Sequence, residues 1–254
     1  MPDPIRVTPL ARLAVLLFLS LAAAPRFAFA DAPCPKAPIQ SLSLPATRAA
    51  LMAHRPVTII AFGSSSTQGI GATAPEHTYP AQLQALLRGH WPDAEVTVIN
   101  RGIGGQMIDS MAVRLVTDVI DPKPVLVIWQ TGTNDALHHM STATFTAALE
   151  DGVRKIHEAG ADVVLMDDQL SPRLAALDDQ MVYDDIMAHT AESGDTQLFS
   201  RARLMKAWFA AGEPMNAVIG PDGLHHTDRG YTCVSRALAD AIVSGSEIRV
   251  GGKR

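Results

Sequence analysis

The sequence predicts an α/β fold, a three-layer α/β/α sandwich around a central, mostly parallel sheet of about five strands. Short runs rich in Val, Ile and Leu carry no period-2 alternation, which is typical of strands that are buried on both faces. Between these runs lie stretches whose apolar residues recur at helical spacing. The alternation predicts βαβ units with right-handed crossovers and, since no linker or repeat interrupts it, one domain.

The predicted elements follow one another along the chain. Apolar runs predict strands at 57–63, 94–100, 124–130 and 161–167, with a weaker strand at 196–200. Amphipathic patterns predict helices over 79–91, 145–156 and 231–242. Ser141 or Thr142 is the expected N-cap of the second helix, and Gly160 is its expected stop.

The first thirty residues differ in character from the rest. Arginines precede an apolar run at 13–24, and Ala28-Phe29-Ala30 offers the small residues that suit cleavage before Asp31. A run of 12 apolar residues is well short of the ~20 that span a bilayer. Residues 1–30 are therefore expected to be a signal peptide rather than a retained anchor, and the protein to be exported, periplasmic or extracellular.

The remaining chain has an ordinary globular composition. Hydrophobic residues make up 47% and charged residues 19%, so the chain can bury a sizeable core. A net charge of −5 without a Lys/Arg run argues against a nucleic-acid or anionic-membrane surface. Residues 31–56, rich in Pro and Ala, are expected to form a lead-in on the surface of the domain at 57–254.

Two cysteines, Cys34 and Cys233, survive the expected cleavage. In an oxidising compartment they can pair and tie the new N-terminus to the last helix. The alternative is two unrelated thiols, and the sequence leaves both open.

Four short polar segments stand out, and three of them directly follow a predicted strand. They are Gly-Ser-Ser-Ser-Thr-Gln-Gly at 63–69, Asn-Arg-Gly-Ile-Gly-Gly at 100–105, Gly-Thr-Asn-Asp at 132–135 and Asp-Gly-Leu-His at 222–225. The ends of parallel strands lie side by side, so these segments are expected to meet at one edge of the sheet. A serine, glycines, an Asn and an Asp/His pair in one cleft form an acyl-transfer constellation.

Each part of such a reaction has a candidate. One of the three serines is the expected nucleophile, because a histidine can take its proton when a carboxylate orients the imidazole. Asp222 and His225 are three residues apart, so one tight turn can place the carboxylate on Nδ1 while Nε2 faces the serine. The N–H after the strand, a glycine N–H and the amide of Asn134 can donate to the oxyanion.

These four segments, in this order, resemble the conserved blocks of the SGNH/GDSL hydrolase superfamily. The resemblance covers most of the chain from Val57 to about Ser244 and implies a flavodoxin-like SGNH fold. It implies Ser65 as nucleophile, with Asp222 and His225 completing the catalytic triad. It also implies an oxyanion hole made by Ser65, Gly105 and Asn134.

The chain departs from the family pattern at two positions. Ser64 stands where the family usually has Asp, and this change is expected to alter local hydrogen bonding more than chemistry. His226 stands where a proline often follows the catalytic His, which affects the shape of that loop. Asp167-Asp168 ends a strand at the same edge, and it can contact substrate or simply start the next loop.

The resemblance implies a secreted serine esterase that cleaves a small-molecule or carbohydrate ester, with acetyl as the expected acyl group. The alternatives are a lysophospholipase or thioesterase acting on longer acyl chains, and a non-catalytic carbohydrate-binding protein. No cofactor is implied. The adjacent histidines at 138–139 and 225–226 point in different directions, so no metal site is expected.

Overall fold

The structure is a computed structural model that describes residues 33–177, 180–192 and 195–247. The predicted signal peptide, residues 1–30, and its cleavage site lie outside the described residues. No helix of the described residues is long and apolar enough to cross a membrane.

A five-stranded sheet with strand order β2-β1-β3-β4-β5 forms the centre of the molecule. Its strands are β1 (Val57–Gly63), β2 (Val96–Gly102), β3 (Leu126–Gln130), β4 (Asp162–Met166) and β5 (Gln197–Phe199). Every neighbouring pair is parallel, and Gly63 at the end of β1 lies opposite Gly102 at the end of β2. The predicted α/β fold is confirmed, with all five strands at their expected places.

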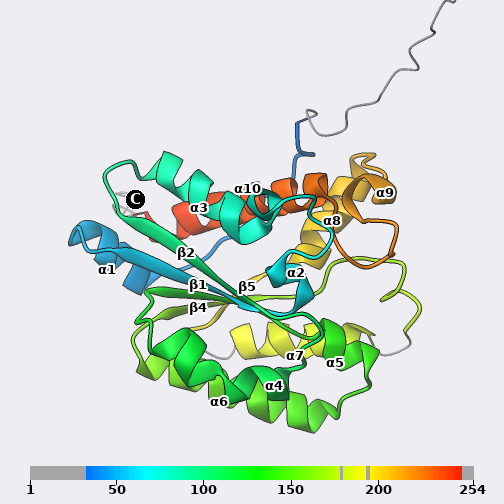
Figure 1. Ribbon diagram of the computed structural model, residues 1–254, viewed down its shortest axis with the longest axis horizontal. Helices are drawn as coiled ribbons and strands as arrows, with labels where there is room; N and C mark the ends of the chain where they lie inside the picture. Colours follow the sequence, from blue (N-terminus) through cyan, green and yellow to red (C-terminus); the bar gives the residue numbers. More distant parts are fainter. Residues whose placement is uncertain (1–32, 178–179, 193–194, 248–254) are drawn as a thin grey trace, which may run out of the picture.

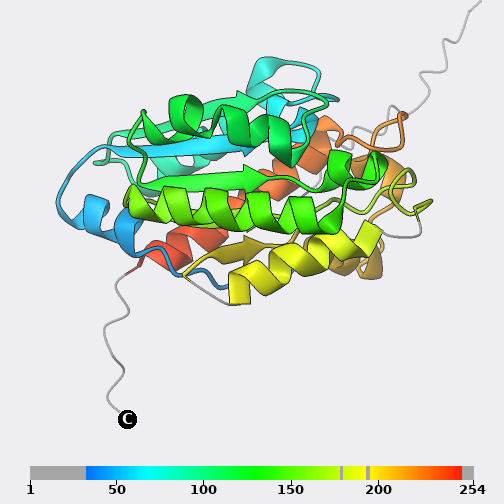
Figure 2. The same cartoon turned by 90° about the horizontal axis from the view of Figure 1, so that it is seen from below.

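Helices cover both faces of the sheet (Figures 1 and 2). On one face lie α1 (Pro45–Met52), α3 (Tyr79–His90), α8 (Arg201–Ala210) and α10 (Asp228–Ser246); on the other lie α4 (Ile108–Val113), α6 (Thr142–Glu158) and α7 (Gln180–Glu192). Shorter helices occupy the loops: α2 (Ser65–Gln68), η2 (Pro75–His77), the π-helical η3 (Val116–Ile120), α5 (Thr133–Leu137) and α9 (Met215–Val218).

The strands contribute side chains to two separate hydrophobic cores, one on each face of the sheet. In β1, Ile59 and Ala61 pack with the α3/α10 side, whereas Ile60 and Phe62 pack with the α4/α6 side. All four side chains are fully buried. A strand that must be apolar on both faces cannot alternate, which is why its sequence is a continuous apolar run.

The lead-in is more than a surface segment, which corrects the expectation for residues 31–56. Leu44 is fully buried in the core, and α1 follows it directly. The Asp162 carboxylate accepts hydrogen bonds from the N–H groups of Ala46 (3.0 Å) and Thr47 (2.8 Å), which satisfies the first turn of α1. This contact could not be predicted from the sequence, because Asp162 belongs to a strand more than a hundred residues later.

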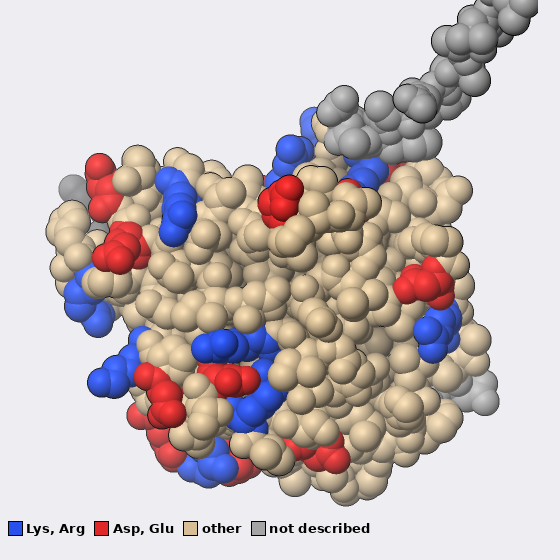
Figure 3. Space-filling view, in the orientation of Figure 1, with Lys and Arg blue, Asp and Glu red and all other residues tan. Residues whose placement is uncertain are grey.

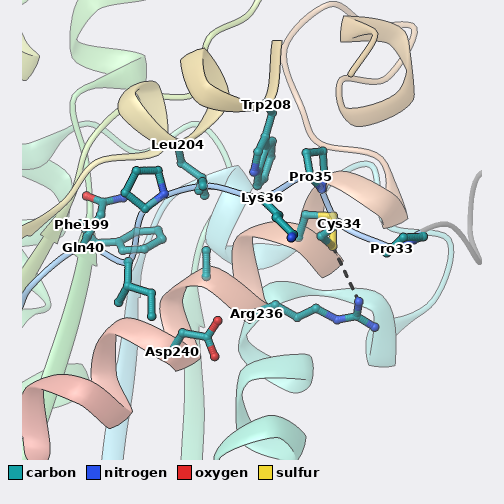
Figure 4. A pocket seen from close by; sticks show the side chains of 15 residues that line it. Pro33, Cys34, Pro35, Lys36, Gln40, Phe199, Leu204, Trp208, Arg236 and Asp240 are labelled. Carbon is teal, nitrogen blue, oxygen red and sulfur yellow. Dashed lines mark hydrogen bonds between the residues drawn. A yellow bond between two sulfur atoms is a disulfide. The ribbon is translucent and has the colours of Figure 1, made fainter. Parts of the chain in front are cut away.

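A disulfide joins Cys34 to Cys233 of α10, across 199 residues of sequence (Figure 4). Beside it, the lead-in and the α8/α10 face enclose a cavity of about 450 Å³. Phe199, Leu204 and Trp208 line its apolar side, and Arg236 lines the side next to the disulfide. The bond therefore holds the start of the described chain against the helix that follows the Asp-Gly-Leu-His segment.

The strand order reverses direction at β1. The chain leaves β1 for β2 on one side and then crosses to β3 on the other side of β1. Such a switch point opens a crevice outside the carboxyl ends of the strands, where ligands bind in open α/β sheets. The polar segments that follow β1, β2 and β3 all meet there.

Candidate active site

The serine turn begins where β1 ends. Ser64 is the N-cap residue, and α2 starts at Ser65, so the Ser65 N–H has no partner inside its own helix. Gly69 ends this single turn of helix with φ +104°, a left-handed conformation that favours glycine. The turn leaves Ser65 at the crevice with 9% of its surface exposed.

Ser65, His225 and Asp222 form one hydrogen-bonded chain. Ser65 Oγ lies 2.7 Å from His225 Nε2, and His225 Nδ1 lies 2.5 Å from Asp222 Oδ2. This geometry suits an imidazole whose Nδ1–H donates to the carboxylate, so that Nε2 can accept the serine proton. The structure thus brings together the three residues that the sequence singled out.

Asp222 is held by its own turn. Its Oδ1 accepts hydrogen bonds from the N–H groups of Leu224 and His225, each 3.0 Å long. Burial acts to raise the pKa of Asp222, but the hydrogen bonds from the His225 ring and from these backbone N–H groups outweigh it and hold the pKa below its usual value. The carboxylate is therefore ionised when it orients His225.

His226 anchors the loop that carries His225. It is buried, its Nδ1 lies 3.0 Å from the Val218 carbonyl oxygen, and it pairs with Ile219 in a short antiparallel bridge. Burial lowers the pKa of His226 to about 3, so the ring is neutral and Nδ1–H can donate to Val218. The residue that departs from the family pattern thus fixes the loop by its own hydrogen bond.

The glycine-rich loop after β2 lies against the nucleophile turn. Gly104 donates its N–H to Gln68 Oε1 (2.8 Å), and a Cβ on Gly104 would lie 3.9 Å from Ser65 Cβ. Gly105 follows with φ +77°, and no hydrogen bond among the described residues uses its N–H. That N–H is thus free for a ligand, beside the serine.

Asn134 lies on the other side of this loop. Its Nδ2 donates to the Gln106 carbonyl oxygen (2.9 Å), which leaves the second amide hydrogen for a ligand. The contact ties α5 to the Gln106–Met107 peptide, at the end of the glycine-rich loop. This hydrogen bond connects Asn134 to the loop that carries Gly105, the other candidate oxyanion donor.

Two further residues support the site and were missed by the sequence analysis. Gln68 fixes the glycine loop through its side chain, as described above. Gln130, the last residue of β3, accepts from the Ser64 N–H (3.0 Å), the Ser64 hydroxyl (3.0 Å) and the Thr67 hydroxyl (3.2 Å). A backbone N–H can only donate, so the atom that faces it must be the amide oxygen of Gln130. Its place two residues before Gly-Thr-Asn-Asp was the available signal.

Asp135 holds the start of α5 from the buried side, away from the crevice. Its carboxylate accepts from the N–H groups of Ile108 (2.9 Å) and Gly132 (3.1 Å), and its side chain is fully buried. Burial raises the pKa of Asp135, against the pull of these hydrogen bonds. Asp135 therefore joins α4 to α5 and does not face the crevice.

The described residues contain no group of three or more His, Cys, Asp or Glu side chains that could hold a metal ion. His138 and His139 are exposed on the loop after α5. The arrangement at the crevice is therefore one nucleophile, one base with its orienting acid, and a set of N–H donors.

Known proteins with the same features were found by sequence and by structure. Residues 31–248 match the family model described as the Non-GDSL lipase-like family. An arylesterase from Vibrio mimicus is 32% identical over 123 residues, which is 48% of this chain and 60% of the relative. The chain thus spans less than two thirds of that relative's length.

Solved structures share the fold. A two-domain esterase active on acetylated mannans superposes with a TM-score of 0.68 at 24% identity, over 81% of this chain and 55% of its own. A G-D-S-L family protein from Desulfitobacterium hafniense DCB-2 gives 0.63 at 18% identity, over 73% and 99%. The predicted kinship with the SGNH/GDSL hydrolases is confirmed, and the chain belongs to the Non-GDSL lipase-like family.

Proposed function

We propose that this protein is a carboxylic ester hydrolase that works through an acyl-enzyme on Ser65. One observation carries the proposal: Ser65 Oγ is 2.7 Å from His225 Nε2, whose other nitrogen is held by Asp222. A serine so placed can lose its proton as it attacks, which an isolated serine cannot do near neutral pH.

The reaction follows from the positions of these groups. His225 Nε2 takes the proton as Ser65 Oγ attacks the ester carbonyl, and the N–H groups of Ser65, Gly105 and Asn134 donate to the oxyanion. His225 then gives the proton to the leaving alcohol oxygen, which produces the acyl-enzyme. Water attacks in the second half with the same base, and the acid product leaves as Ser65 regains its proton.

The proposed substrates carry a small acyl group such as acetyl, with carbohydrate as a candidate alcohol. The shared fold supports this choice, since one protein that superposes on this chain is active on acetylated mannans. The face seen in Figure 3 carries few charged side chains across its centre. Export is proposed with it, because a signal-like segment precedes a disulfide-bonded domain.

The experiment is a chain-length profile with p-nitrophenyl esters from acetate to palmitate, with Ser65→Ala as the matched control. We expect kcat/KM to be highest at acetate or butyrate and to be abolished in the variant. A maximum at long chains would replace the proposal with a lysophospholipase or thioesterase. Full activity of Ser65→Ala would refute the acyl-enzyme itself.

A further inference from the structure

Two buried carboxylates lie behind the oxyanion side of the crevice. Asp168 follows β4 and is fully buried, and Asp184 on α7 is 7% exposed. The sequence left open a substrate contact for Asp168, but a fully buried carboxylate cannot touch a substrate in the crevice. Its function must therefore be exerted through other residues.

Hydrogen bonds connect these carboxylates to α5. The Thr133 hydroxyl donates to Asp168 Oδ1, and the Asp168 N–H donates to Asp184 Oδ1 (3.1 Å). Thr133 is the first residue of α5 and the direct neighbour of Asn134. A continuous path thus runs from α7 through Asp168 to the residue before the candidate oxyanion donor.

The surroundings of the pair disfavour two ionised carboxylates. The Oδ2 atoms of both Asp168 and Asp184 are buried without a hydrogen-bond partner among the described residues. The charged groups around them are Asp167, Asp185 and the buried Arg201. One guanidinium that also donates to the Asp167 carbonyl oxygen cannot neutralise so many carboxylates.

The direction of titration agrees with this geometry. Burial, and then the neighbouring Asp184, raise the pKa of Asp168 well above its usual value. Burial, and then Asp167, raise the pKa of Asp184 to about 7. Both pKa values are raised, so burial and the neighbouring carboxylates disfavour the ionised form of each group.

We propose that Asp168 and Asp184 are positioning residues for the oxyanion site, which act through the Thr133 hydroxyl to fix the first turn of α5 and with it the Asn134 amide. The inference rests on the oxyanion role proposed above for Asn134. α5 has only five residues, Thr133–Leu137, and so has few internal hydrogen bonds to set its direction. Side-chain anchors at its first turn must do so instead.

The test compares conservative and disruptive changes at each end of the Thr133–Asp168 contact. For p-nitrophenyl acetate, Thr133→Val and Asp168→Ala should each lower kcat at least tenfold with KM within twofold. Thr133→Ser keeps the hydroxyl, and Asp168→Asn keeps an acceptor for Thr133 and offers a donor to Asp184. Both should retain at least a third of kcat. If Asp168→Ala does not fold, the Thr133 pair decides alone.

A second background separates positioning from general damage. In Asn134→Ala, the donor is already gone, so adding Thr133→Val should lower kcat less than twofold. An equal loss in both backgrounds, no loss from Thr133→Val in the otherwise unchanged enzyme, or Thr133→Ser as damaging as Thr133→Val would overturn the positioning role. Full activity of Asn134→Ala alone would instead refute the oxyanion role of Asn134, a different failure.

Discussion

Gln130 accepts three hydrogen bonds from the serine turn, and the loss of its amide should weaken both the fold and the reaction. Gln130→Met keeps the size of the side chain and removes the amide. The Ser64 N–H and hydroxyl then lose their acceptor in a buried site, whereas the Thr67 hydroxyl still lies 3.2 Å from the Tyr79 hydroxyl.

The magnitude follows from these contacts. Each buried donor left unpaired costs about 1–3 kcal/mol. The Nε2 of Gln130 is itself buried without a partner among the described residues, and its removal offsets about one such cost. We therefore expect Gln130→Met to lower the free energy of unfolding by about 1–3 kcal/mol. If the displaced Ser65 raises the activation free energy by about 1.4 kcal/mol, kcat falls tenfold.

The assay is urea unfolding together with steady-state kinetics on p-nitrophenyl acetate. Ser64→Ala is the matched control, because it removes the hydroxyl but keeps the backbone donor, and it should cost less than Gln130→Met. In the double variant the two losses should be less than additive, since they share a contact. An unfolding midpoint of Gln130→Met equal to that of the parent, or full additivity, would refute the reasoning.

Three further predictions concern stability. His226→Asn keeps a donor in place of Nδ1 and removes a group whose pKa burial lowers from 6.5 to about 3. Below about pH 6.5 the unfolded chain binds a proton at this histidine and the folded chain does not. The parent should therefore lose stability relative to the variant as pH falls towards 4, by at most about 1.4 kcal/mol per pH unit. Parallel pH curves in urea unfolding would contradict this. A Cβ at Gly102 would lie 2.0 Å from a backbone nitrogen of α2, so Gly102→Ala should destabilise the fold by about 3 kcal/mol or more and lower kcat. The control is Gly89→Ala in α3, where the new Cβ meets open space, and it should be neutral or stabilising by about 0.5–1 kcal/mol. Equal melting temperatures of the two variants would exclude the clash. Replacing Cys34 and Cys233 by serine opens a loop of 199 residues and should lower stability by about 5 kcal/mol in the chain-entropy account, while a change under 1 kcal/mol by urea unfolding would argue against it.

The sequence predicted the parts of the fold that rest on local pattern. Buried strands and amphipathic helices carry their own periodicity, so all five strands and the helices α3, α6 and α10 were found. Helix α1 was missed, because its first turn depends on the Asp162 carboxylate from β4, a contact that no local pattern shows. Short helices such as α9 have too few turns for a period to be visible.

The residues of the site likewise fall into those that local sequence reveals and those that depend on long-range contacts. Ser65, Asp222 and His225 lie in short motifs whose residue types indicate acyl-transfer chemistry. The structure places His225 within hydrogen-bonding distance of both Ser65 and Asp222. Gln130 and Asp168 act through long-range hydrogen bonds to the serine turn and to Thr133, and a glutamine or aspartate at a strand end does not show from the sequence which contacts it makes. The tertiary contacts that orient a site are thus harder to read than the groups that react.

The most direct test of the account is the site at which a fluorophosphonate modifies the active enzyme. Intact mass and peptide mapping of the inactivated protein should give one adduct per chain on Ser65, with activity lost in proportion. The adduct should be absent from Ser65→Ala and should form far more slowly in His225→Ala, whose base is missing. Inactivation by an adduct on another residue, or continued ester hydrolysis by protein fully modified at Ser65, would contradict the assignment of Ser65 as the nucleophile.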